Sequence, residues 1–193
     1  MIMGVIQFLY GIHHDFKGGN PLALLEYIKY YKDDKMLKMP EIGCNFYEYC
    51  LFYAPLNYKN KVVVDYGADI GSSAIYFLSK GATKVIGIEI DKKAKNISKN
   101  LKFNEFNFKN AFAYTTQKHP KGDILKMDIE GAEKDILTKE YLKTFQQFAI
   151  GLHPFAYTTY FYNKLEKIIL NLGGKRYGMV SSQGKSEIVY IKT

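Results

Sequence analysis

Arginine is nearly missing from this chain: among its 27 basic residues, Arg176 is the only arginine. Arginine binds phosphates and reads base edges through paired hydrogen bonds, so a dedicated nucleic-acid surface would lack its main residue type. The formal net charge of +8 therefore comes from lysines, which are spread along the sequence. This pattern favours a bias of composition over a basic groove. Nucleic acid is an alternative partner that the composition does not favour.

Cysteine is also scarce, and long apolar runs are absent. Cys44 and Cys50 form neither a CxxC motif nor a disulfide framework, which suits a reducing cytoplasm. No apolar run approaches the roughly 18 residues that a membrane span needs. The apolar start, residues 1–10, lacks a basic flank and a small-residue cleavage site, so we expect a structural strand there and not a signal peptide.

Short apolar strands alternate with helices from residue 61 onward. The predicted strands cover residues 61–65, 84–90, 107–114, 123–130 and 148–153, and the predicted helices cover 70–81, 91–104, 132–137 and 158–174. This alternation predicts a doubly wound α/β fold, with a mostly parallel sheet and helices on both faces. YGMVSS and SEIVYIK, around the turn at residues 183–185, predict a final antiparallel hairpin. We expect one domain over 1–193, with a helical N-terminal extension over 1–60 and a core over 61–193.

A glycine-rich loop follows the first predicted strand, in the string VVVDYGADIG. Asp65 ends the strand, and Gly67 and Gly71 permit a sharp turn and a close approach to a ligand. The loop is not the G-x-G-x-x-G of dinucleotide sites, and it lacks the Lys-Ser/Thr of phosphate loops. Its acidic residues favour a cation, such as the sulfonium and ammonium groups of S-adenosylmethionine. A generic tight turn before a helix is the alternative.

Further acids follow the second and fourth strands. Glu89 ends KVIGIEI, where a carboxylate can accept hydrogen bonds from both ribose hydroxyls; a surface acid that caps the next helix is the alternative. In KMDIEGAE, Asp128 and Glu130 alternate with apolar residues, so both should share one side of an extended strand end. Such a pair can orient a hydroxyl, accept its proton or hold a divalent ion, but two carboxylates are too few to predict a metal site. Alternatively, Glu130 and Glu133 simply sit at a helix N-terminus, which favours acids.

His153 closes the fifth predicted strand. Its imidazole titrates near neutrality and is a candidate general base, and a structural histidine bonded to a neighbouring loop is an equal alternative. The remaining histidines, His13, His14 and His119, lie in segments without supporting ligands. We expect no catalytic role for them.

The strings VVVDYGADIG, KVIGIEID and LKMDIEGAE together resemble the FkbM-type family of S-adenosylmethionine-dependent methyltransferases, over about residues 61–153. The resemblance implies S-adenosylmethionine as the cofactor and a hydroxyl of a carbohydrate or other small molecule as the methyl acceptor. It implies that Asp128 lies beside the transferring methyl group. We expect cofactor contacts from Asp65, Gly67, Ala68, Asp69, Gly71, Glu89 and Ile90, and catalytic roles for Asp128, Glu130 and His153.

The chain departs from the family's pattern at two positions. Asp69 stands where the pattern has asparagine, which adds a negative charge beside the sulfonium. Gly151 stands where the family often has glutamate, two residues before His153. The resemblance therefore implies that one candidate substrate carboxylate is missing.

Two other functions compete with this interpretation, and the sequence leaves the oligomeric state open. An RNA methyltransferase would explain the positive charge and the many aromatic residues. However, the string DIEG lacks the Asn/Asp-Pro-Pro-aromatic turn that grips a base, and no RNA-binding module is recognisable. A non-catalytic subunit that keeps the fold as a binding module is the third hypothesis, against which the intact glycine loop and Glu89 argue.

Overall fold

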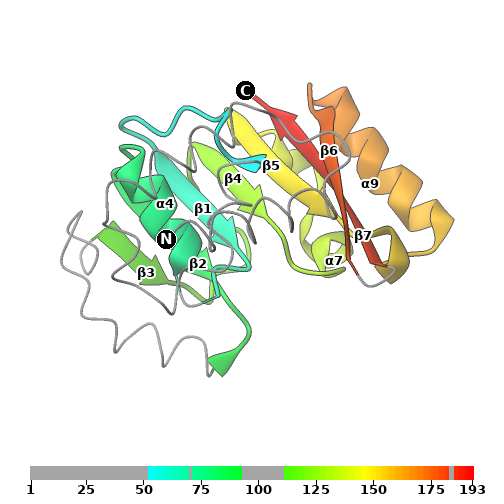
Figure 1. Ribbon diagram of the computed structural model, residues 1–193, viewed down its shortest axis with the longest axis horizontal. Coiled ribbons are helices and arrows are strands. Elements are labelled where there is room, and N and C mark those ends of the chain that lie inside the picture. Colours follow the sequence, from blue (N-terminus) through cyan, green and yellow to red (C-terminus); the bar gives the residue numbers. More distant parts are fainter. Residues whose placement is uncertain (1–51, 70, 93–110, 183–184) are drawn as a thin grey trace, which may run out of the picture.

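The computed structural model describes residues 52–69, 71–92, 111–182 and 185–193. These residues form one seven-stranded sheet in the order β3-β2-β1-β4-β5-β7-β6 (Figure 1). The strands are β1 (Val62–Tyr66), β2 (Lys84–Ile88), β3 (Phe112–Tyr114), β4 (Ile124–Met127), β5 (Gln147–Leu152), β6 (Lys175–Ser182) and β7 (Lys185–Lys192). The described helices are α4 (Ser72–Ser79), α7 (Glu133–Ile136), α8 (Lys139–Leu142) and α9 (Thr159–Asn171), with a 3₁₀ turn η2 (Pro154–Ala156).

The sheet is parallel from β3 to β5, and only the hairpin runs the other way. β1 pairs in parallel with β2 on one side and with β4 on the other, while β7 lies antiparallel between β5 and β6. The predicted mostly parallel sheet with a final antiparallel hairpin is confirmed. Because the strand order changes direction between β1 and β4, the carboxyl ends of these two strands form the switch point where open α/β sheets bind ligands.

Both faces of the central strands are buried, and each face has its own apolar cluster. Val63 and Ile124 belong to the cluster that contains the α4 side chains, whereas Val64 and Leu125 belong to the cluster that contains α8 and α9 residues. Neighbouring residues of a strand point to opposite faces, so a strand buried on both sides is mostly apolar. The β-branched run of β1 fits this pattern, whereas Asp65 of β1 and Lys126 of β4 are buried charges.

Residues just before β1 also belong to the core. The Phe52, Tyr53, Leu56 and Tyr58 side chains are buried in the α4 cluster, and the ring of Tyr58 stacks on that of Phe77 with centroids 5.1 Å apart. The end of the predicted N-terminal extension thus packs against the core. The predictions for residues 1–51, including both cysteines, and for residues 93–110 lie outside the described residues.

The fourth strand is shorter than the sequence predicts. It ends at Met127, and it cannot extend to Glu130 as predicted, because Glu130 and Gly131 have φ angles of 49° and 111°. Such left-handed conformations end an extended strand. The prediction that Asp128 and Glu130 share one side of an extended strand end is therefore wrong. The turn is packed against η2, since a Cβ on Gly131 would lie 2.5 Å from the Cβ of Ala156.

The predicted helices shorten in the same way. In the predicted helix 132–137, only the four residues of α7 are helical. The predicted helix 158–174 is also shorter, because α9 ends at Asn171, ahead of Gly173, whose φ is 89°. Within the described part of the chain, no helix combines the length and apolar character needed to cross a membrane.

Truncation of a buried leucine tests the packing of the α8 and α9 face. Leu142 is fully buried, whereas Leu170 is 48% exposed on α9. We expect Leu142→Ala to lower the free energy of unfolding by about 2–5 kcal/mol, because it leaves a cavity. Leu170→Ala is the matched control and should change it by no more than about 0.5 kcal/mol. Urea denaturation measures both. Equal effects would contradict this assignment of the core.

Candidate functional site

The glycine loop after β1 is hydrogen-bonded to the last residue of β2. The backbone N–H groups of Gly67 and Ala68 both donate to the carbonyl oxygen of Ile88, at 2.9 and 3.2 Å, and the N–H of Gly71 closes the turn on Ala68 at 2.8 Å. Gly67 has a φ of 76°, and a Cβ there would lie 2.0 Å from the carbonyl oxygen of Asp128. Only glycine fits where the loop crosses the end of β4, so backbone atoms line this part of the site.

Glu89 fixes the outer side of the same loop. One carboxylate oxygen accepts the N–H of Asp69 at 2.9 Å and the other accepts the N–H of Asp91 at 2.8 Å, while Tyr114 donates its hydroxyl to the carbonyl of Asp69. Residues 93–110 lie outside the described part of the chain, so the alternative that Glu89 caps the next helix stays a prediction. A carboxylate has about four acceptor positions, so Glu89 keeps capacity for ligand hydroxyls. Ile90, beside it, is 93% exposed, which puts an open apolar surface next to that acceptor.

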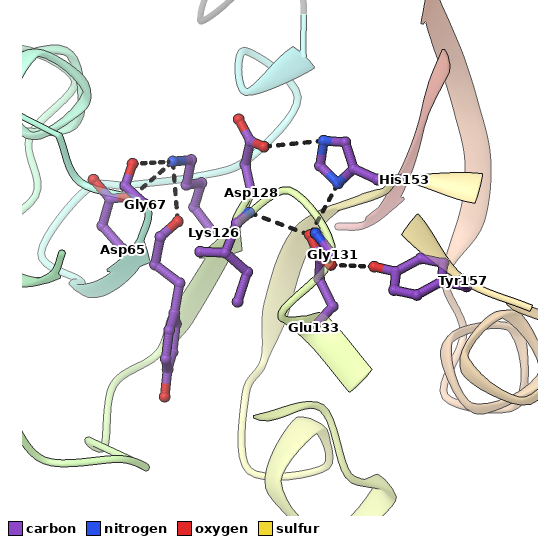
Figure 2. A network of polar contacts seen from close by, with 10 residues as sticks. Asp65, Gly67, Lys126, Asp128, Gly131, Glu133, His153 and Tyr157 are labelled. Atoms are coloured by element: carbon purple, nitrogen blue, oxygen red, sulfur yellow. Dashed lines mark hydrogen bonds and ion pairs between the residues drawn. The ribbon is translucent and has the colours of Figure 1, made fainter. Parts of the chain in front are cut away.

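Asp65 lies beneath the loop and is completely buried. Its carboxylate is 3.1 Å from the Nζ of Lys126 (Figure 2). It also accepts the hydroxyl of Ser73. Burial raises the pKa of Asp65, and the charge of Lys126 and the two hydrogen bonds offset this only in part. Lys126 also donates to the carbonyls of Tyr66 and Gly67, at 3.1 and 2.8 Å. The pair therefore ties the ends of β1 and β4 together and supports the loop.

A second buried carboxylate, that of Glu133 at the start of α7, organises the end of β4. It accepts the N–H groups of Ile129 and Gly131, at 3.2 and 2.8 Å, and the hydroxyl of Tyr157. Its Oε1 is 3.0 Å from the Nδ1 of His153. Burial acts to raise the pKa of Glu133, but the hydrogen bonds from His153 and Tyr157 lower it below its ordinary value. Glu133 is thus an ionised anchor.

His153 connects this anchor to the open edge of the sheet. The imidazole is buried, and its Nε2 lies 3.5 Å from Oδ1 of Asp128, whose side chain is 30% exposed. Burial acts to lower the pKa of His153, but the hydrogen bond and charge of Glu133, with the charges of Asp128 and Glu187, raise it above its ordinary value. Glu133, His153 and Asp128 form a chain of polar groups that leads from the interior to the surface (Figure 2).

The structure brings some of the predicted site residues together and separates others. Asp128 and His153 face each other, but Glu130 is exposed on the left-handed turn, and no described residue forms a hydrogen bond or ion pair with its side chain. The sequence interpretation missed the role of Glu133. Its place in the first turn of α7 matches the predicted helix-start acid, but the contact with His153 joins residues 20 positions apart.

Gly151, the position of the implied missing carboxylate, faces a carboxylate from another strand. A Cβ on Gly151 would lie 2.0 Å from Oε1 of Glu187, near the start of β7. Glu187 thus fills the space that a side chain at position 151 would enter. His119, by contrast, is held against the carbonyl of Ile136 by its Nε2 at 3.2 Å.

Two viral proteins are similar to this chain in sequence. Over 114 residues it is 37% identical to uncharacterized protein 158B of Sulfolobus islandicus rod-shaped virus 1, covering 57% of this chain and 72% of the viral protein. Over 162 residues it is 29% identical to uncharacterized protein 65 of a Sulfolobus islandicus filamentous virus (isolate Iceland/Hveragerdi), covering 78% of this chain and 92% of the viral protein. No family model matches the sequence.

The similar solved structures are class I methyltransferases. PH1948 of Pyrococcus horikoshii, provisionally described as an RNA methyltransferase, has 19% identity and a TM-score of 0.53 over 74% of this chain and 80% of its own. Magnesium protoporphyrin IX methyltransferase of Synechocystis PCC 6803, solved with bound S-adenosylmethionine, has 17% identity and a TM-score of 0.53 over 82% of this chain and 83% of its own. The ribosomal protein L11 methylase of Lactobacillus delbrueckii subsp. bulgaricus has 13% identity and a TM-score of 0.51 over 76% of this chain and 77% of its own. These likenesses confirm the predicted Rossmann-like methyltransferase fold.

The buried pair beneath the glycine loop generates a stability prediction. Lys126→Met should lower the free energy of unfolding by about 3–5 kcal/mol, because Asp65 then remains buried without its counter-charge. The double variant Asp65→Asn/Lys126→Met removes that charge and should recover part of the loss. Urea denaturation of the three proteins checks this. A single variant at least as stable as the double variant would contradict the proposed pairing energy.

Proposed function

We propose that this chain, which belongs to the same family as uncharacterized protein 158B of Sulfolobus islandicus rod-shaped virus 1, is an S-adenosylmethionine-dependent methyltransferase that acts on a hydroxyl of a sugar or another small molecule. One arrangement carries the proposal. The glycine loop, Glu89 and the chain Asp128–His153–Glu133 meet at the carboxyl edge of the parallel strands. Ligands of open α/β sheets bind at this edge.

The residues that would hold the cofactor fit its chemistry. Glu89 retains acceptor capacity for the two ribose hydroxyls, and the 93% exposed side chain of Ile90 offers an apolar surface to the adenine. The carboxylate of Asp69 is exposed beside the loop and would attract a cationic ligand. The backbone between Gly67 and Gly71 leaves room for close contact. S-adenosylmethionine supplies a methyl group on a positively charged sulfur.

Asp128 is the residue we assign to the acceptor. Its carboxylate is partly exposed and would accept a hydrogen bond from the substrate hydroxyl, which aligns the oxygen for an in-line displacement. A carboxylate is a weak base for an alcohol, so Asp128 would first align the hydroxyl and would take its proton late in the displacement. His153, held by Glu133, positions Asp128. Glu130, exposed on the next turn, is the second candidate acid.

We further propose that the enzyme is of the FkbM type. The support is the string Lys126–Glu133, in which the charged residues have separate tasks. Lys126 ties the loop to Asp65, Asp128 is partly exposed and faces His153, and Glu133 anchors His153. A generic helix-start sequence would not need a buried cation and a buried anion seven residues apart.

RNA methylation is the second candidate, and three aromatic residues after His153 favour it. Phe155, Tyr160 and Phe161 are 46%, 71% and 41% exposed, and exposed rings can stack on bases. Against it, the turn after β4 has neither proline nor an aromatic ring. Methyl-transfer assays against glycans and bulk RNA separate the two. RNA binding that is weak and steeply salt-dependent favours the hydroxyl substrate, whereas sequence-selective binding at high salt favours RNA.

Glu89→Ala tests the cofactor site. We expect it to weaken S-adenosylmethionine binding by about 1–3 kcal/mol, because the ribose hydroxyls lose their acceptor. Isothermal titration calorimetry measures the affinity. Glu140→Ala, an exposed acid on α8, is the control and should bind as the unaltered protein does. An unaltered protein that fails to bind the cofactor at millimolar concentration would overturn the proposal. Binding without methyl transfer to any substrate would favour a non-catalytic subunit.

Asp128→Asn tests the catalytic assignment. The variant should fold and bind cofactor, yet lose roughly 10²–10⁴-fold in turnover, which is the usual size of acid–base assistance. Thermal melts, cofactor titrations and turnover rates should be compared with those of Glu130→Gln. A loss confined to Asp128→Asn assigns the chemistry to Asp128. Near-normal turnover in folded Asp128→Asn would show that the catalytic centre lies elsewhere.

A further inference from the structure

Three side chains from separate strands converge beside the proposed acceptor site. Asp128 follows β4, His153 follows β5, and Glu187 lies near the start of β7. Each offers one ligand atom, and these atoms lie within 4.8 Å of one another. We propose that Asp128, His153 and Glu187 form a binding site for a divalent cation.

The strand pairing explains why these residues meet. β7 runs antiparallel to β5, with Leu152 opposite Ile188, so the start of β7 lies beside the end of β5. Val189 and Ile191 belong to the α4-side cluster, and Glu187 precedes them by even steps and therefore points to the same face. On the facing strand, Gly151 leaves the space that the Glu187 carboxylate fills.

The imidazole of His153 is oriented as a ligand. Its Nδ1 is occupied by the buried carboxylate of Glu133, at 3.0 Å, which directs Nε2 toward Asp128. A carboxylate behind a metal-binding histidine is the usual outer arrangement of such sites, because it fixes the tautomer and the ring. Glu133 is fully buried and is not one of the three proposed ligands, so its support for Nε2 is independent of the acids that would bind the ion.

The distance between His153 and Asp128 also suits a shared ion. Nε2 of His153 and Oδ1 of Asp128 are 3.5 Å apart, which is long for a hydrogen bond. Two ligands that each lie about 2.1 Å from one cation are roughly 3–4 Å apart. The two carboxylates and the Glu133 anchor also concentrate negative charge around one imidazole, and a cation would offset it.

The ligand set indicates the class of ion. One imidazole and two carboxylates suit Mn²⁺ or Zn²⁺ better than the all-oxygen sites of Mg²⁺ and Ca²⁺. The partial exposure of Asp128 leaves a side of the site open to a further ligand. The inference rests on the proposed function and deepens it, because an oxygen of the hydroxyl substrate would be that ligand.

Mn²⁺ is the probe for the test, used on the chelator-treated full chain without cofactor. Loss of the free Mn²⁺ electron paramagnetic resonance signal should show one saturable site, and spin-echo modulation should show coupling to one imidazole nitrogen. Glu187→Gln should weaken Mn²⁺ binding about 10–100-fold. Gly151→Ala should weaken it as well, because its methyl group displaces the Glu187 carboxylate. Glu140→Gln is the matched control and should bind Mn²⁺ as the unaltered protein does.

Thermal melts identify variants that fail to fold. If either Glu187→Gln or Gly151→Ala fails to fold, the other variant still tests the site. The absence of saturable Mn²⁺ binding would overturn the cation site, as would an affinity that neither Glu187→Gln nor Gly151→Ala changes. S-adenosylmethionine titrations on the same samples separate the two proposals. A protein that binds the cofactor but not Mn²⁺ overturns only the cation site, and one that binds Mn²⁺ but not the cofactor overturns the proposed function.

Discussion

Glu133 has no exposure to solvent, so protein donors must replace the water that its carboxylate loses. Two N–H groups of the preceding turn, the hydroxyl of Tyr157 and the imidazole of His153 supply them. A buried carboxylate that lacked these donors would cost several kcal/mol. The same bonds fix the turn after β4, the end of β5 and the segment that follows η2. The geometry of the proposed acceptor site depends on this one desolvated group.

Asp65 is buried to the same extent, but its charge is balanced differently. A lysine from the neighbouring strand pairs with it and also donates to the carbonyls of Tyr66, the last residue of β1, and Gly67, the first residue of the glycine loop. One buried carboxylate thus supports the proposed cofactor side, and the other supports the proposed acceptor side. The loop beside Asp65 and the turn beside Glu133 each contain a non-glycine residue with left-handed backbone, Asp69 and Glu130. Strained positions of this kind persist where the surrounding structure holds them, and they are common at functional sites.

The antiparallel hairpin changes the chemistry available at the carboxyl edge of the sheet. In a purely parallel sheet, only residues that follow strands reach this edge. Because β7 runs the other way, it brings a residue near its start, Glu187, to the end of β5. Gly151 makes room for this residue, since it has no side chain to exclude the Glu187 carboxylate. The family resemblance implied a missing carboxylate at position 151, and the carboxylate that occupies this space comes from a strand more than 30 residues later.

The sequence by itself determined the strands, their mostly parallel order with a final hairpin, and the loop between Gly67 and Gly71, because period-two patterns, β-branched runs and glycines are local signals. It also placed Asp128 and His153 at strand ends. Only the tertiary structure decided that β4 stops before Glu130, that Glu133 binds His153, and that Glu187 joins them. These contacts depend on strand register and on desolvation, which act between segments far apart in the chain and leave no periodic pattern in either one.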